Sequence, residues 1–160
     1  MTTYCDYCNS HPEDTYNNNY HDNEYGFPLK DDAALFERFV LEINQAGLSW
    51  IAILKKQDNF HRAYDGFDAD KVAAYGEMDT ARLLADAGII RNRLKVRAAI
   101  ENARRIQNLR GEFGSFKGWL DAHHPLSLEE WTKLFKKKRH NTLGDLTLAR
   151  QRSAQLRGEQ

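Results

Sequence analysis

The residues best suited to chemistry lie between Tyr20 and Trp50. This stretch opens with aromatic rings, a histidine and acids set among turn-forming residues, then continues into a helical pattern that carries one glutamate, Glu42. It ends in a glycine turn followed by the tryptophan. A carboxylate among aromatic faces suits a flat ligand that is polar or positively charged. The stretch therefore predicts a binding pocket, and the rest of the chain is either its scaffold or the surface that brings a substrate to it.

Glu42 can be interpreted in two ways. A carboxylate at the edge of a helix most often reaches water, and this is the better interpretation of Glu42 taken alone. A step of 100° per residue, however, places it beside Leu35 and Phe39 at the border of the apolar arc. Desolvation there would raise its pKa. Because aromatic residues and a sharp turn also lie nearby in the sequence, we favour a functional carboxylate.

A basic hairpin is the second candidate site. Two predicted helices are joined by a short turn that contains Gly88, and Arg91, Arg93 and Lys95 gather where the second helix begins. The free N–H groups and the positive dipole end of a helix N-terminus favour a phosphate. Such a hairpin can hold a DNA backbone without reading its sequence. An ordinary pair of helices is the alternative, and the placement of the basic residues favours DNA.

A metal site is the third candidate. Cys5 and Cys8 are three residues apart, and His11 and His21 follow them. Two thiols at this spacing suit one corner of a tetrahedral zinc site, but a structural site needs four ligands and the chain has no further cysteine. Two free surface thiols are an equal alternative.

Composition places these sites in one globular domain, or at most two small lobes. The chain has 160 residues, of which 41% are hydrophobic, and no apolar run approaches the length that spans a membrane. The start of the chain is polar, so we expect no signal peptide and a cytoplasmic protein.

Charge is segregated along the chain although the net charge is zero. Residues 1–32 hold seven acids and one base, and residues 91–110 hold seven bases and one acid. Residues 131–140 hold five bases and no acid. Segregated charge creates local fields that a zero sum hides, although a solvated helix face is the ordinary explanation of any one run.

The hydrophobic pattern predicts an all-α fold, a compact bundle of short helices. Residues 1–30 carry turn signals and are expected to be irregular. The first predicted helix begins after Asp31 or Asp32 and ends near Gly47, and the second begins near Ser49. Two short helices follow: Asp68 or Asp70 caps one, and Asp79 caps the other, which Gly88 ends. A long helix covers about 92–109, and a Ser127–Glu130 capping box opens the last one. We expect a folded domain over residues 1–137 and an atypical basic tail over 138–160, poorly ordered or loosely helical.

Four segments together resemble one known family. The segments YHDNEYGFP, LEINQAGLSWIAILKK, FDADKVAAY and LLADAGIIRNRLKVRAAIENAR are similar, in order, to the constitutive 3-methyladenine DNA glycosylases, the Tag family of the helix-hairpin-helix superfamily. The resemblance extends from about Cys8 to Phe135, and the HDNEYG and QAGLSW motifs are highly specific to that family. It implies hydrolysis of the N-glycosidic bond of a methylated, positively charged adenine in damaged double-stranded DNA.

The resemblance also implies a role for each residue of the pocket. Glu42 matches the glutamate that hydrogen-bonds the flipped base and is the candidate catalytic residue. Tyr20 and Trp50 match the stacking aromatics. Tyr25 stands where the family often has tryptophan, so the ring is kept but its face is smaller.

For the DNA interface, the resemblance implies two turns. The QAGLSW turn, with Gln45, Gly47 and Leu48, matches the loop that fills the gap left by the flipped base, and Leu48 is the candidate wedge. The turn from Gly88 to Arg93 matches the phosphate-binding hairpin, to which Lys95 adds a charge. Beyond it the next aspartate is Asp121, and no lysine occupies the position of a lyase nucleophile. We therefore expect a monofunctional enzyme.

A structural zinc is also implied by the resemblance. Cys8 and His21 match the first pair of ligands, and the second pair, expected near the C-terminus, is missing. The substitutes present in the chain are Cys5, His11 and His140. We expect a monomer without membrane partners. The alternatives are a DNA-binding homologue with impaired catalysis and a small zinc-dependent interaction module.

Overall fold

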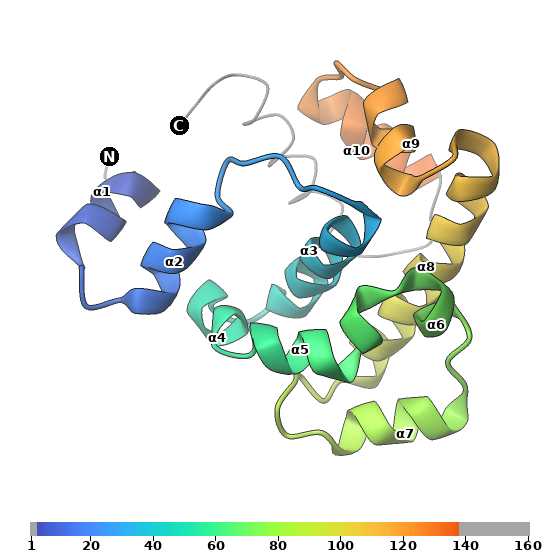
Figure 1. Ribbon diagram of the computed structural model, residues 1–160, viewed down its shortest axis with the longest axis horizontal. Helices are drawn as coiled ribbons and strands as arrows, with labels where there is room; N and C mark the ends of the chain where they lie inside the picture. Colours follow the sequence, from blue (N-terminus) through green and yellow to red (C-terminus); the bar gives the residue numbers. More distant parts are fainter. Residues whose placement is uncertain (1–2, 138–160) are drawn as a thin grey trace.

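The computed structural model describes residues 3–137, and in this range the chain forms helices and no strands (Figure 1). The all-α prediction is confirmed. The elements are α1 (Tyr4–Ser10), α2 (Thr15–Asn23), α3 (Asp32–Gln45), α4 (Trp50–Leu54), α5 (Gln57–Ala63), the 3-10 helix η1 (Asp65–Phe67), α6 (Ala69–Ala73), α7 (Glu77–Ala85), α8 (Arg93–Phe113), α9 (Phe116–Ala122) and α10 (Leu128–Lys137).

Helix α3 is central to the architecture. The Asp31 carboxylate accepts a hydrogen bond from the Ala34 N–H and so caps the first turn. Every residue from Leu35 to Asn44 except Glu37 is buried, and the helix packs against α4, α5, α8, α9 and η1. The helix ends two residues before Gly47, whose φ of 81° lies in the left-handed region that glycine tolerates.

The hydrophobic core lies between α3, α6 and α8 and is closed by α9 and α10. Phe36, Phe67, Trp119 and Trp131 are fully buried in it. Helix α8 is the longest element and runs along the bundle from the α7 turn to α9 (Figure 1). Helices α1 and α2 form a pair at one side and contact the remainder through α4 and through Arg38 of α3.

The prediction that residues 1–30 are irregular is wrong for Tyr4–Ser10 and Thr15–Asn23, which form α1 and α2. The Thr3 hydroxyl and the Asp14 carboxylate cap α1 and α2 by accepting from the N–H groups of Asp6 and Asn17. The asparagines and aspartates that suggested turns serve here as helix caps and helix residues, since the same side chains favour both positions.

Two predicted helix ends also need correction. Asp79 is the third residue of α7 and accepts from the Gly76 N–H, so Gly76, not Asp79, is the N-cap. That helix ends at Ala85, before Gly88. Helices α5 and α9 were not predicted. The Ser127–Glu130 capping box is confirmed, because the N–H of each residue donates to the side chain of the other.

The predicted tail, residues 138–160, lies outside the described residues. Among the described helices, none has both the length and the apolar character needed to cross a bilayer.

Candidate active site and DNA interface

Three helices bring the predicted pocket residues together. Tyr20 lies on α2, Glu42 on α3, and Trp50 is the first residue of α4. The rings of Tyr20 and Trp50 meet edge to face, with centroids 5.3 Å apart. Tyr20 and Glu42 are buried, with 5% and 6% of their surface exposed. The two rings therefore meet, and the buried Glu42 carboxylate lies near enough to Tyr20 for its charge to act on the phenol.

Burial changes the acidity of this carboxylate. Desolvation raises the pKa of Glu42 from its ordinary value to about 7, against the opposing effect of the Arg38 guanidinium. Burial likewise raises the pKa of Tyr20, to about 12, so this phenol stays neutral. At neutral pH Glu42 is thus close to its midpoint between the acid and the carboxylate.

Arg38 is a pocket residue that the sequence analysis missed. Its guanidinium carbon lies 4.5 Å from the ring centroid of Tyr20 and 5.4 Å from that of Trp50. It forms an ion pair with Glu24, the residue that follows α2. A flat cation of the protein itself therefore lies against the two rings and near Glu42, which shows that this environment accommodates such a group.

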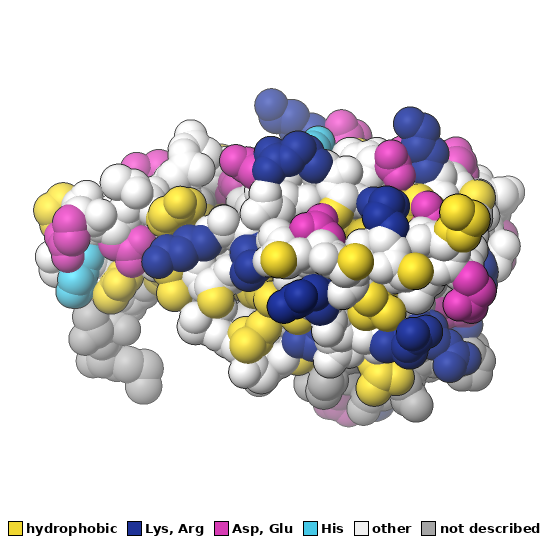
Figure 2. Space-filling view, turned by 90° about the horizontal axis from the view of Figure 1, so that it is seen from below, with side chains coloured by type: hydrophobic (Ala, Val, Ile, Leu, Met, Phe, Trp, Pro, Cys, Tyr) yellow, Lys and Arg dark blue, Asp and Glu magenta, His cyan; other side chains and the backbone are white. Residues whose placement is uncertain are grey.

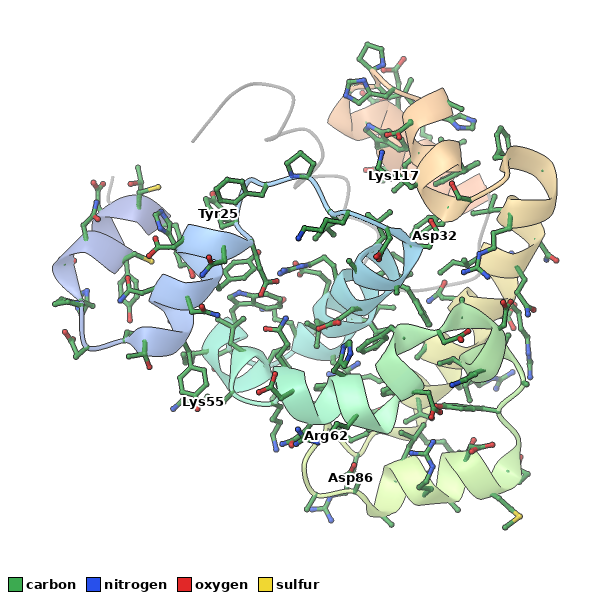
Figure 3. The ribbon with its side chains drawn as sticks, viewed as in Figure 1. Tyr25, Asp32, Lys55, Arg62, Asp86 and Lys117 are labelled. Atoms are coloured by element: carbon green, nitrogen blue, oxygen red, sulfur yellow. The ribbon has the colours of Figure 1, made fainter. Side chains whose placement is uncertain are left out.

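Tyr25 extends the aromatic cluster toward the N-terminal helices. Its ring centroid lies 6.1 Å from that of Tyr20 and 5.0 Å from that of Tyr4. Figure 3 shows it at the end of α2, where the chain turns toward α3. The cluster therefore continues from the buried pair of rings to a half-buried edge.

The turn between α3 and α4 presents Leu48 to solvent. Gln45 closes this turn, because its side-chain Nε2 donates to the Leu48 carbonyl at 3.1 Å and its own carbonyl accepts from the Leu48 N–H at 2.8 Å. Leu48 has 39% of its surface exposed although its side chain is apolar. A rigid turn with a protruding apolar side chain, next to the pocket, has the form of a wedge.

The α7–α8 turn is fixed by α5 and presents two arginines. Asn59 donates to the Gly88 carbonyl and Lys56 donates to the Ala87 carbonyl. Arg91 and Arg93 are exposed. Basic side chains lie in several separate groups over the face that is seen from below (Figure 2).

The N-terminus of α8 differs from the expected phosphate site. The Asn92 side chain accepts from the N–H groups of Leu94 and Lys95, so the helix supplies its own cap there. Leu94 has 75% of its surface exposed and was not predicted to take part. Phosphate contacts from this hairpin would therefore come mainly from arginine side chains.

Lys95 does not point outward as a phosphate ligand would. Its ammonium donates to the carbonyls of Asn44 and Ala46, at 2.7 and 2.8 Å. These carbonyls lie at the end of α3, immediately before the wedge turn. Lys95 therefore joins the basic hairpin to the turn beside the pocket, which is a different role from the one that its charge suggested.

The structure does not pair Cys8 with His21. His21 Nε2 lies 3.1 Å from the sulfur of Cys5, whereas buried Cys8 donates to the Asn17 carbonyl. No group of three or more possible ligands occurs among the described residues. The arrangement there does not fit a four-ligand zinc site, and zinc stays a prediction.

Comparison with known proteins decides the family. The model of the family described as methyladenine glycosylase matches residues 8–156. The chain belongs to that family. The match continues beyond residue 135, where we expected the resemblance to end, so it gives no support for a division at residue 137.

Individual members of the methyladenine glycosylase family agree with this assignment. DNA-3-methyladenine glycosylase 1 of Escherichia coli is 55% identical over 85 residues, which are 53% of this chain and 46% of that protein. The Haemophilus influenzae DNA-3-methyladenine glycosylase is 39% identical over 65% of this chain and 55% of its own length. The chain thus matches about half the length of these curated relatives.

A solved relative extends the comparison to the fold. The structure of 3-methyladenine DNA glycosylase I from Staphylococcus aureus, described as showing the basis of 3-methyladenine recognition, is 29% identical. It aligns with a TM-score of 0.78 over 88% of this chain and 85% of that chain.

Proposed function

We propose that this protein is a DNA repair glycosylase, a hydrolase that flips 3-methyladenine out of alkylated double-stranded DNA and cleaves its N-glycosidic bond. The observation that carries the proposal is the buried Glu42 carboxylate near Tyr20, whose ring meets that of Trp50. Membership of the methyladenine glycosylase family supports it.

The chemistry follows from the charge of the substrate. A base in a duplex must leave the stack before a pocket can read it. A methylated, positively charged base is already a good leaving group, so the protein mainly has to recognise and hold it. Aromatic faces and one carboxylate attract a flat cation, and Leu48 can fill the gap that the base leaves. Strand cleavage is not part of the proposal, because no lysine occupies the position of a lyase nucleophile.

Release of free base from alkylated DNA tests the proposal. We expect wild-type protein to release 3-methyladenine and to leave the strand intact. The variant Glu42→Gln, which keeps size and hydrogen bonding but loses the charge, should lose most of that rate. A wild-type protein that binds duplex but releases no base at any pH would instead support the DNA-binding homologue with impaired catalysis.

Zinc requires a separate test. Cys5 and His21 are close enough to share a metal, and a full set would need two further ligands. Metal analysis of purified protein, with Cys5→Ser as the comparison, decides this point. One equivalent of zinc that disappears in the variant would establish a site, and a full equivalent without any DNA affinity would favour an interaction module. That the protein acts as a monomer is also a proposal, which sedimentation in the presence and absence of duplex would check.

A further inference from the structure

Arg38 lies in this site, but the proposed function assigns it no role. It lies on α3 four residues before Glu42, a spacing that puts both side chains on the same face of the helix. Only 4% of its surface is exposed, which is rare for arginine. A cation is kept in such a place only where other groups compensate for its lost hydration.

The Arg38 guanidinium is only partly paired among the described residues. Glu24 pairs with it, and the Glu24 side chain keeps 26% of its surface exposed. Both residues line a cavity of about 280 Å³ together with Glu37 and Gln57. The Nη1 atom of Arg38 is buried and has no hydrogen-bond partner among the described residues. Part of its charge is therefore left to act on its surroundings, and it acts most strongly where water is scarce.

Glu42 lies in that water-poor region, and among the described residues the charge that acts on it most is that of Arg38. On α2 the neighbouring titratable group is the neutral phenol of Tyr20, followed by Glu24, which repels a carboxylate. Helix α4 carries no titratable side chain. On α8 the ammonium of Lys95 is taken up by two backbone carbonyls. Arg38 is thus the cation that opposes the effect of burial on Glu42.

We propose that Arg38 is a positioning residue whose guanidinium holds the buried Glu42 carboxylate in its anionic form, the form that attracts a positively charged base. With Arg38, Glu24 and Glu42 all charged, the pocket carries one net negative charge, which a cationic base neutralises. Without Arg38, Glu42 would be protonated over a wider pH range and this attraction would be lost. The inference rests on the proposed glycosylase function.

The pH profile of base release tests the proposal through Arg38→Met and Arg38→Lys. In Arg38→Met we expect the acidic limb to move up by about one pH unit, with a rate about fivefold lower at pH 7 and near wild type at pH 9. Arg38→Lys keeps the charge, so its limb should stay close to that of wild type. A merely structural role would lower the rate at every pH and leave the limb in place, which would overturn the proposal.

Titration of Glu42 itself gives a readout without substrate. The carboxyl carbon can be followed by NMR in protein labelled with ¹³C-glutamate and assigned with Glu42→Gln. The midpoint should rise in Arg38→Met and fall in Glu24→Gln, which leaves Arg38 in place and removes a negative charge. If Arg38→Met does not fold, Arg38→Gln, which removes the same charge and keeps a polar side chain, takes its place in this comparison. Unchanged midpoints would refute the role of Arg38.

The two proposals fail in different ways. If wild type releases no base but the midpoints move as expected, the glycosylase function is wrong and the electrostatic coupling stands. If wild type releases base and the midpoints do not move, the function stands and Arg38 has another role.

Discussion

Glu42 illustrates at the level of one residue how function opposes stability. The carboxyl has an ordinary pKa of 4.5, which we take for the unfolded chain, and burial raises it to about 7 in the folded protein. Between these values the unfolded state binds fewer protons, so the free energy of unfolding falls as pH rises and levels off above pH 7. A buried carboxylate therefore costs stability at the pH where it is useful.

Glu42→Gln should consequently stabilise the protein in a pH-dependent way. We expect the free energy of unfolding to exceed that of wild type by about 2 kcal/mol at pH 8, and the difference to shrink at pH 5, where the wild-type side chain is protonated. Urea unfolding at both pH values measures it. An equal difference at pH 5 and pH 8 would contradict the raised pKa.

The pocket residues were only partly predictable from the sequence. Tyr20, Glu42 and Trp50 could be found because a carboxylate and rings close in sequence suggest a site. The structure brings the rings of Tyr20 and Trp50 together and buries Glu42, and their roles stay a prediction. Arg38 could not be found from the sequence, because its burial results from the packing of α2 and α4 on α3. Its spacing of four residues from Glu42 was the available signal. Which cysteine faces His21 likewise depends on how α1 packs against α2.

At the level of elements, Lys95 joins α8 to the end of α3. Replacing it by methionine keeps the aliphatic stem but removes the donors to two carbonyls. We expect Lys95→Met to lower the free energy of unfolding by about 1–2 kcal/mol. The matched change Arg93→Gln, at an exposed position on the same helix, should leave stability within about 0.5 kcal/mol. Urea unfolding compares the two variants. Equal losses of stability would argue against the role of Lys95 in joining α8 to α3.

Arg93→Gln should instead act on DNA. If this exposed arginine contacts a phosphate, its loss weakens duplex binding by a similar factor for every sequence. The slope of log affinity against log salt should decrease by about one. Fluorescence anisotropy with a labelled duplex at several salt concentrations measures both effects. An unchanged slope would place Arg93 away from the DNA backbone.

The long helices were predictable, whereas four of the short ones were not. Helices α3 and α8 are long enough for the apolar spacing to recur, and their caps Asp31 and Asn92 lie at the predicted positions. Helices α1, α2, α5 and α9 have at most nine residues each, too few for a period to show. Such short helices depend on tertiary packing for their stability, which local sequence does not report.

At the level of the whole molecule, the pocket lies at a seam. Helices α1 and α2 supply Tyr20 and, at their edge, Tyr25, while the larger body supplies Glu42 and Trp50 (Figures 1 and 3). The pair of helices contacts that body through α4 and through Arg38 of α3. Anything that loosens α1 and α2 would therefore separate the two rings before it affects the main core, and activity would be lost before the fold.

Asp32 joins three helices at the other side of the molecule, and its partners lie up to 85 positions away in the sequence. Its carboxylate accepts from the backbone N–H groups of Phe116 and Lys117 and from Arg110, so it joins α3, α8 and α9 (Figure 3). Burial tends to raise its pKa, but these hydrogen bonds lower it below the ordinary value of 3.8. Because the folded pKa is depressed, the contribution to stability is present above the unfolded pKa and is lost as pH falls through the folded one.

Asp32→Asn should therefore cost stability at neutral pH but not in acid. We expect the free energy of unfolding to fall by about 2 kcal/mol at pH 7 and by the same amount at pH 5.5, with the difference from wild type shrinking below pH 3.8. Asp121→Asn is the matched control, because Asp121 pairs with Lys117 at the surface, where an ion pair contributes about 0.5 kcal/mol or less. Chemical unfolding of both variants across this pH range gives the comparison. If the two variants lose equal stability at pH 7, Asp32 is not the link between the three helices. The packing of α9 against the core then depends on its buried aromatic side chains.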